Sequence, residues 1–303
     1  MPGGGGRTGA TYTQAVRRPS RPVVRLAALI LCALTVTACG AKPEPTSGKL
    51  DSTYPVSVRD GLNRVVTVEA PPRLVLVVSD GPERLLARLG VRAAVAPEGV
   101  TVARVQAAHP DLVVVGPGYT NAQEQRNDAF IRKLDVPVFV MPGGRLQDIE
   151  VGAVELGVIT NHAEEGRALA IALRKQREQL AKRLAGVPPL SVYVDAGFGT
   201  SIQRTTLLAR LITLAGAKLV GPADGLTTVN AKMLHRLNPD AYIATNTSGV
   251  TLARLRSRPA LSTLRAVSSG RVFVVDPTAA RADVSAYSLM RSLARSLHPA
   301  VVG

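Results

Sequence analysis

The chain contains one strand and helix pattern twice, and this internal repeat constrains the fold more than any other feature. An apolar, β-branched run follows Pro72 and another follows Pro189, and each predicts a buried strand. The helix predicted after each run ends at a glycine, Gly90 in the first half and Gly216 in the second, since glycine accepts the left-handed conformation of a helix C-cap. The two prolines lie 117 residues apart and the two glycines 126 residues apart.

Two further pairs of segments extend the repeat in the same order. Pro-Asp dipeptides at 110–111 and 239–240 each break a helix and precede an apolar strand, at a separation of 129 residues. Strands at 136–141 and 270–275 close the two halves. Strands that alternate with helices imply parallel sheets covered on both faces. We therefore expect an α/β fold with two doubly wound lobes; a chance likeness between ordinary strand and helix units is the alternative.

A single long helix is predicted between the two halves. Residues 162–185 contain no proline, and their only glycine, Gly166, lies in the first turn. Leucines at helical spacing form one face and charged residues fill the other. At ~1.5 Å per residue the helix is about 35 Å long, enough to cross from one lobe to the other. Because a helix is a stiff connection, we expect the lobes to open and close only slightly.

The N-terminus has the pattern of an export signal. Residues 26–38 are apolar but too few for the ~20 that span a bilayer, and five arginines with no acidic residue precede them. Cys39 follows Ala38 at the predicted cleavage point, and this junction resembles the lipobox of bacterial lipoproteins, in which the cysteine is acylated. We expect lipid on Cys39 and a location on the extracytoplasmic face of the cell membrane. An ordinary signal, and export by a twin-arginine route through Arg17 and Arg18, stay open.

These features divide the chain into five segments. The predicted signal covers residues 1–38, and a flexible tether rich in proline, serine and glycine covers 39–52. The N-terminal lobe covers 53–160, the interlobe helix 161–186 and the C-terminal lobe 187–303. The only cysteines are Cys32, which leaves with the signal, and Cys39, so no disulfide is expected in the mature protein.

The net charge indicates which partners suit the protein. The full chain carries +15, and removal of the five arginines of the signal leaves +10. Such a charge attracts the protein to an anionic membrane and concentrates anionic small molecules. The arginines are scattered rather than clustered, so nucleic acid is not an expected partner. We expect a monomer that binds a small anionic ligand or a metal chelate.

Four motifs carry a resemblance to a known family. They are the predicted hairpin at 54–68, the loop and helix at 79–90, the two Pro-Asp strand starts, and the segment at 258–275 before the last strand, which is the most specific. With these motifs, residues 54–276 resemble the class III substrate-binding proteins of ABC importers, whose members bind ferric siderophores, haem and cobalamin. The resemblance implies two α/β lobes joined by one long helix.

The ligand of such a fold is expected between the lobes. Ligands of open α/β sheets bind outside the carboxyl ends of the strands. In this chain those ends lead into loops at 79–82, 117–121, 142–145, 196–200, 246–249 and 277–281. The candidate ligand-binding residues of these loops are Ser79, Asp80, Tyr119, Arg145, Phe198, Asn246 and Arg281. Arg281 is the preferred partner for an anionic group, since arginine offers a fork of donors to a carboxylate.

The resemblance also implies a function and a partner. It implies a lipid-anchored binding protein, without a cofactor of its own, that delivers a ferric siderophore, haem or corrinoid to an ABC importer. In the family, a glutamate on each lobe meets arginines of the permease. Glu83 matches the N-terminal glutamate, but Lys232 stands where the C-terminal one is expected. A lipoprotein of the same fold that binds a partner and transports nothing is therefore the alternative.

Enzymatic and metal-binding functions have less support. The chain contains neither the Gly-x-Ser-x-Gly elbow of a hydrolase nor a Gly-x-x-x-x-Gly-Lys-Ser/Thr phosphate loop. Gly197 and Gly199 follow a strand as in a dinucleotide fingerprint, but Ile202 occupies the position of the third glycine. We expect no catalytic residue. The histidines fall at helix ends and outside the cleft loops, where capping or surface roles are expected rather than metal ligation: His109, His162, His235 and His298.

Overall fold

The computed structural model describes residues 52–79, 81–97, 99–117, 121–197, 199–225 and 227–303. The predicted signal, Cys39 and three candidate ligand-binding residues (Asp80, Tyr119 and Phe198) lie outside the described residues. Residues 49–303 form one compact unit. Its first described residue, Ser52, donates from its backbone N–H to Asn161 Oδ1 at 2.8 Å. None of the helices in the described part of the chain has the length and apolar character needed to cross a membrane.

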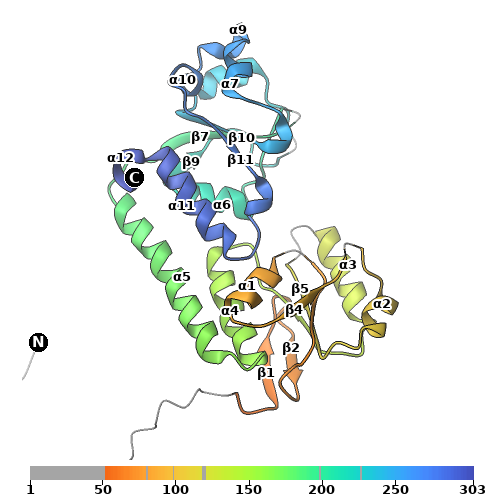
Figure 1. Ribbon diagram of the computed structural model, residues 1–303. Helices are drawn as coiled ribbons and strands as arrows, with labels where there is room; N and C mark the ends of the chain where they lie inside the picture. Colours follow the sequence, from red (N-terminus) through yellow and green to blue (C-terminus); the bar gives the residue numbers. More distant parts are fainter. Residues whose placement is uncertain (1–51, 80, 98, 118–120, 198, 226) are drawn as a thin grey trace, which may run out of the picture. The chain divides into compact units, whose positions relative to one another are not determined.

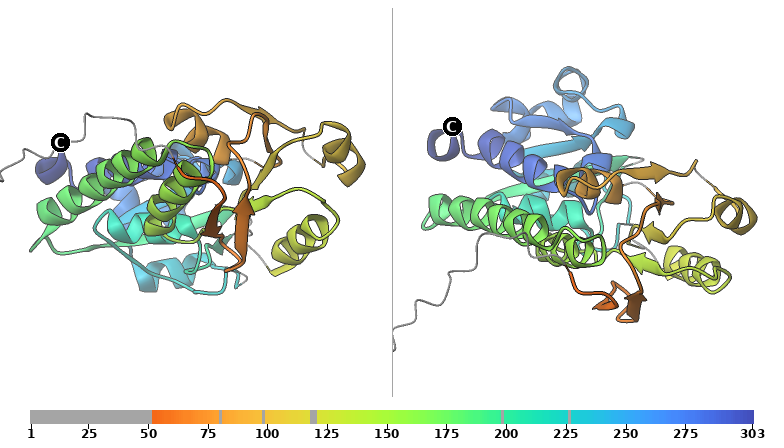
Figure 2. Two further views of the ribbon diagram at one scale, coloured as in Figure 1. Left: turned by 90° about the horizontal axis from the view of Figure 1, so that it is seen from below. Right: turned by 60° about the horizontal axis from the view of Figure 1, so that its bottom comes forward.

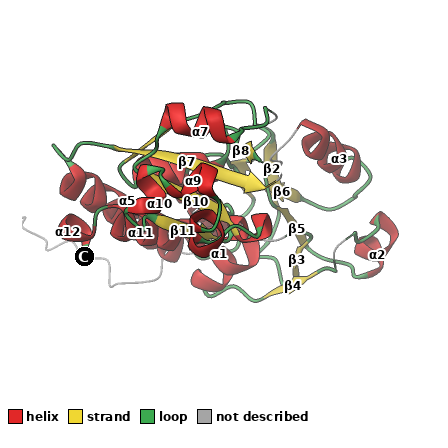
Figure 3. Ribbon diagram, turned by 90° about the horizontal axis from the view of Figure 1, so that it is seen from above, coloured by secondary structure: helices red, strands yellow, loops and turns green. Residues whose placement is uncertain are grey.

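The N-terminal lobe begins with an antiparallel hairpin, β1 (Val56–Arg59) and β2 (Val65–Val68), and continues into a parallel sheet of four strands in the order β4-β3-β5-β6. The sheet strands are β3 (Val75–Val77), β4 (Ala93–Val95), β5 (Leu112–Val115) and β6 (Val138–Val140). The helices are α1 (Pro82–Arg88), α2 (Val102–Ala107), α3 (Asn121–Ile131) and α4 (Leu146–Ile159). Figure 3 shows this sheet from above.

Helices cover both faces of this sheet, as predicted for parallel strands. Val75 and Val77 of β3 belong to the apolar core formed with α1 and α4. Leu76, between them, belongs to a separate core with α2 and α3. The alternation follows from the strand geometry, because successive side chains point to opposite faces. All three side chains are buried, which explains why the segment reads as a continuous apolar run.

The C-terminal lobe contains a parallel sheet in the order β9-β7-β10-β11, with the short strand β8 antiparallel beside β7. Its strands are β7 (Leu190–Gly197), β8 (Thr200–Ser201), β9 (Ala217–Leu219), β10 (Ala241–Thr245) and β11 (Val272–Val275). Its helices are α6 (Leu207–Leu214), α7 (Ala231–Leu237), η1 (Asn246–Ser248), α8 (Leu252–Arg256), α9 (Pro259–Ser262), α10 (Arg265–Ser268), η2 (Pro277–Ala279), α11 (Ser285–Leu297) and α12 (Pro299–Val302).

The two sheets confirm the internal repeat. Counted along the chain, the second parallel strand of each lobe lies at one edge of its sheet, followed by the first, the third and the fourth. The Pro-Asp motifs perform the same task in both lobes. Asp111 accepts the backbone N–H groups of Arg73 and Leu74 at 2.8 Å, and Asp240 accepts the N–H and the hydroxyl of Ser191 at 2.9 and 2.6 Å. Each carboxylate thus holds the start of the neighbouring strand in register.

The long helix predicted for 162–185 is present as α5 (Ala163–Leu184), which runs from the N-terminal to the C-terminal lobe (Figure 1). It packs along α4, as the two views of Figure 2 show, and contacts α11 and α12 near its end. The helices approach closely where Gly157 of α4 meets Gly166 of α5. A Cβ on Gly157 would lie 3.0 Å from the Gly166 Cα and 2.6 Å from the carbonyl oxygen of His162.

Candidate functional site

The carboxyl ends of β3, β4 and β5 open into a cavity of about 630 Å³, which we call the cleft cavity. The chain reverses its direction of travel across the sheet between β3 and β5, and ligands of open α/β sheets bind at such a switch point. The cavity volume is within the range of small-molecule sites. The described lining residues belong to the N-terminal lobe, apart from Arg281 of the C-terminal lobe: Val78, Ser79, Val95, Ala96, Gly99, Val100, Val115, Gly116, Pro117, Arg126, Asn127, Phe130 and Arg281.

Of the predicted ligand-binding residues that the structure describes, Ser79 and Arg281 line the cleft cavity. The Ser79 hydroxyl accepts the backbone N–H of Gly116, so it also joins the loops after β3 and β5. Arg281 follows η2 and reaches the cavity from the C-terminal lobe. Its charge helps to lower the pKa of Asp276, after the larger effect of the hydrogen bonds between Asp276 and Thr278. Hence Arg281 supplies positive charge at the point where the two lobes face each other.

The sequence analysis missed the contribution of α3. Arg126, Asn127 and Phe130 of this helix line the cleft cavity. Arg126 is exposed and forms no ion pair with any described residue. The prediction considered only loops at strand ends, and α3 has a mostly polar sequence without a clear apolar face, so nothing indicated that it turns side chains toward the ligand. The one general feature of the sequence that favoured further ligand-binding arginines was the excess of arginine over acidic residues.

Arg145 and Asn246 do not line the cleft cavity. Arg145 precedes α4 and its Nη2 donates to Oδ1 of Asp148 at 2.9 Å, while its backbone N–H donates to Oδ2 at 2.9 Å. The hydrogen bond with Asp148 raises the pKa of the Arg145 guanidinium. Asn246 is exposed in η1, and its side chain helps to lower the pKa of Asp276 in the same lobe. Both side chains therefore have partners within their own lobe.

The two predicted docking residues differ in their surroundings. Glu83 is half-buried in the first turn of α1, and its Oε2 accepts the backbone N–H of Gly81 at 2.7 Å. A carboxylate at this position also complements the helix dipole. Lys232 is exposed in the first turn of α7 and forms no ion pair with a described residue. Lys232 is thus available to a partner, while Glu83 has a structural partner of its own.

Three of the four histidines hydrogen-bond backbone carbonyls near helix ends. The ring nitrogens of His162, His235 and His298 lie 2.6, 2.7 and 3.0 Å from the carbonyl oxygens of Thr160, Ala260 and Gly216. These hydrogen bonds give each of the three rings a partner within the protein. Within the residues that the structure describes, no group of three or more histidines, cysteines and carboxylates could hold a metal ion.

A comparison with family models gives the deciding match. Residues 93–279 match the model described as "Periplasmic binding protein". The chain belongs to the periplasmic binding protein family. The family and the two-lobed fold confirm the resemblance in the sequence, and they establish the chain as a binding protein and not an enzyme. No curated protein sequence matches the chain.

Solved structures share the family fold at low sequence identity. The periplasmic vitamin B12-binding protein BtuF of Vibrio cholerae is 12% identical with a TM-score of 0.61, over 76% of this chain and 98% of that one. CeuE of Helicobacter pylori, solved with nickel and histidine, is 13% identical with a TM-score of 0.63, over 81% and 89%. The haem-binding protein HmuT is 20% identical with a TM-score of 0.57, over 84% and 93%. At these identities the likeness shows the fold alone.

Proposed function

We propose that the chain is an extracytoplasmic, lipid-anchored binding protein that delivers a metal chelate to an ABC importer. The observation that carries the proposal is the cleft cavity at the switch point of the N-terminal sheet, where Arg126 and Arg281 contribute positive charge from different lobes. Ferric siderophores, haem and corrinoids present oxygen acceptors such as carboxylates, phenolates and amides. Guanidinium groups donate hydrogen bonds to such acceptors, and to a carboxylate they can donate two in parallel.

The structural neighbours support this class of ligand. BtuF is a vitamin B12-binding protein, HmuT is a haem-binding protein, and CeuE was solved with nickel and histidine. Each of these ligands is a metal complex. Phe130 and several aliphatic side chains beside the two arginines supply the apolar surface that a chelate also needs. Arg281 stands across the cavity from the N-terminal loops, so a small closing motion about α5 brings it onto the ligand.

Lipid attachment through Cys39 is the second part of the proposal. The apolar run that precedes Cys39 and the arginines before it support an export signal with a lipobox. Acyl chains contribute ~0.8 kcal/mol of membrane affinity per buried methylene. Cys39→Ser should therefore move the full chain from the membrane fraction to the soluble fraction. Equal labelling of wild type and variant by a fatty-acid analogue would contradict lipid attachment.

A non-transport lipoprotein of the same fold is the second candidate, and Lys232 favours it. A permease that pairs with a glutamate on each lobe meets a positive charge at this position. Deletion of the gene, followed by uptake assays with labelled ferric siderophores, haem and cobalamin, separates the two functions. The transport function predicts loss of uptake of one chelate and its return on complementation. Unchanged uptake of all three classes would favour the non-transport lipoprotein.

A further inference from the structure

A second cavity, of about 570 Å³, lies within the C-terminal lobe, and we call it the C-lobe cavity. It lies between one face of the sheet and the helices α7, α8 and α9, and Gly199 and Ser248 line it from the loops after β7 and β10. The chain reverses direction across the C-terminal sheet between these two strands. The C-lobe cavity thus occupies the switch point of its own sheet. Among the described residues, the two cavities have no lining residue in common.

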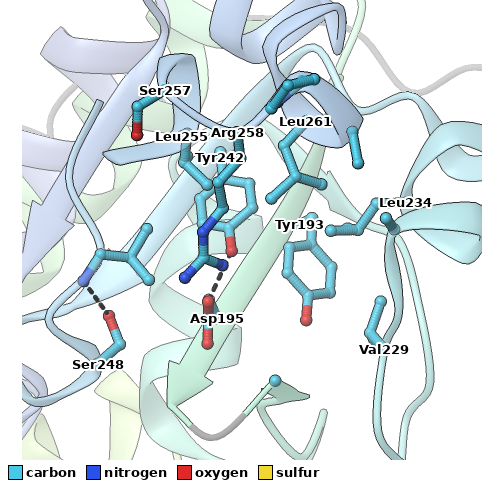
Figure 4. A pocket seen from close by; sticks show the side chains of 15 residues that line it. Tyr193, Asp195, Val229, Leu234, Tyr242, Ser248, Leu255, Ser257, Arg258 and Leu261 are labelled. Carbon is cyan, nitrogen blue, oxygen red and sulfur yellow. Dashed lines mark hydrogen bonds between the residues drawn. The ribbon is translucent and has the colours of Figure 1, made fainter. Parts of the chain in front are cut away.

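Tyr193 of β7 gives this cavity an unused hydrogen-bonding group. The residue is only 1% exposed, and its hydroxyl points into the cavity (Figure 4) without a hydrogen bond to any described residue. The hydroxyl oxygen is not one of the fully buried unpartnered atoms, so it is accessible from the cavity to a small molecule. Burial, and to a smaller extent the charge of Asp195, raise the pKa of Tyr193. The phenol therefore stays protonated and can donate to an acceptor in the cavity.

Opposite charges face the same space without forming an ion pair. Asp195 is buried, and its two oxygens accept from the Tyr242 hydroxyl at 2.6 Å and the Gly197 N–H at 2.8 Å. Each carboxylate oxygen can accept more than one hydrogen bond, so Asp195 has capacity for another donor. Arg258 extends its guanidinium beside the Tyr242 hydroxyl (Figure 4), yet it forms no ion pair with a described residue. Because Arg258 and Asp195 form no ion pair with each other, both charges can meet a ligand that carries both signs.

The rest of the cavity wall is apolar. Aliphatic side chains from α7, α8, α9 and the adjoining loops line it: Val229, Leu234, Val250, Leu255 and Leu261. We propose that the C-lobe cavity binds a small amino acid with an apolar side chain. Its carboxylate meets Arg258 and Tyr193, its ammonium group meets Asp195, and its side chain packs on the aliphatic wall. Oppositely charged groups on one small molecule thus pair with the two lining charges that do not pair with each other.

Binding of L-leucine and L-phenylalanine to the full chain in detergent micelles tests the proposal. Titration calorimetry and saturation-transfer NMR should detect one bound molecule per chain. The probes 4-methylpentanoate and 3-methylbutylamine each carry one charged group of leucine, and each should bind at least about tenfold more weakly. Failure of both amino acids to bind at millimolar concentration, or equal affinity for leucine and its two half-analogues, would overturn the proposal.

Variants locate the amino acid in the C-lobe cavity. Tyr193→Phe keeps the ring and removes the unpartnered hydroxyl, and it should weaken amino acid binding about tenfold, as should Arg258→Gln. Arg256→Gln is the matched control, because Arg256 ends α8 two residues earlier and does not line the cavity. Unchanged affinity in both Tyr193→Phe and Arg258→Gln would place the amino acid elsewhere, for example in the cleft cavity, and would refute the site.

Discussion

The hydroxyl of Tyr287 lies 2.9 Å from a carboxylate oxygen of Glu150, and this contact joins the two lobes. Tyr287 belongs to α11 of the C-terminal lobe and Glu150 to α4 of the N-terminal lobe. Arg174 and Arg177 of α5 donate to the same carboxylate at 3.3 and 3.0 Å. Burial, and then the hydrogen bond with Glu150, raise the pKa of Tyr287. One buried carboxylate therefore links the interlobe helix to both lobes.

The two arginines that bind Glu150 should differ in their effect on stability. The Arg177 side chain is 20% exposed and that of Arg174 is 57% exposed. Ion pairs weaken as they become exposed to water, so Arg177→Gln should lower the free energy of unfolding by about 1 to 2 kcal/mol and Arg174→Gln by less than about 1 kcal/mol. Urea unfolding of both variants measures the difference. Equal losses in the free energy of unfolding would contradict the expectation that the more buried ion pair contributes more to stability.

The close contact between α4 and α5 predicts that adding a single methyl group at this contact lowers the stability of the protein. In Gly157→Ala the new Cβ meets backbone atoms of α5, so the variant should be less stable by about 1 to 3 kcal/mol. Gly152→Ala on the same helix is the control. Its Cβ meets the end of the flexible Met141 side chain, which can move, and alanine favours the helix. Thermal unfolding should separate the two variants; equal melting temperatures would contradict the packing argument.

Asp240 makes the stability of the C-terminal lobe depend on pH. Burial alone would raise its pKa, but hydrogen bonds from Ser191 and the ion pair with Arg265 outweigh burial and lower it from the ordinary 3.8. A lowered pKa stabilises the fold above the unfolded value, and the stabilisation disappears as the pH falls through the folded value. Asp240→Asn should thus cost about 1 to 2 kcal/mol at neutral pH and less near pH 3. A cost that is the same at both pH values would contradict this linkage.

The predicted docking residues should affect uptake through encounter with the permease. Glu83→Gln should reduce chelate uptake in cells, since a rim charge controls the rate and specificity of association. Lys232→Glu should change the salt dependence of association, because it reverses an exposed charge. Association of the purified chain with permease in membranes, measured at several salt concentrations, tests both variants. Wild-type uptake and wild-type salt dependence in both would favour the non-transport lipoprotein.

Much of the fold was predictable because periodicity and turn residues act locally. The strands β3, β5, β6, β7, β10 and β11 and the helix α5 appear where the apolar runs and prolines indicate. The edge strands β4 and β9 were missed because neither forms a run of β-branched residues; β4 has the sequence Ala-Ala-Val. In Ala217–Leu219 a lysine interrupts the pattern.

The candidate site was less predictable, because it depends on which segments the fold brings together. Ser79 and Arg281 were found from their positions after strands, which is a local property. Arg126 reaches the cleft cavity from the middle of a polar helix, and Arg145 turns back to Asp148 of its own helix. Neither outcome follows from sequence spacing. In the same way, Tyr193 and Tyr242 appear in the sequence as core residues of strands, and only the structure shows the cavity beside them.

Titration calorimetry of the full chain in detergent with a ferric siderophore, haem and a corrinoid tests the central claim most directly. We expect one of these chelates to bind with a stoichiometry of one. Arg281→Gln and Arg126→Gln should each weaken the binding of that chelate on the order of tenfold to a hundredfold, because each removes a charged donor from the cleft cavity. Arg145→Gln is the control and should bind as wild type does, since Arg145 pairs with Asp148. Absence of binding by all three chelates, or wild-type affinity in both Arg281→Gln and Arg126→Gln, would contradict a chelate site in the cleft cavity.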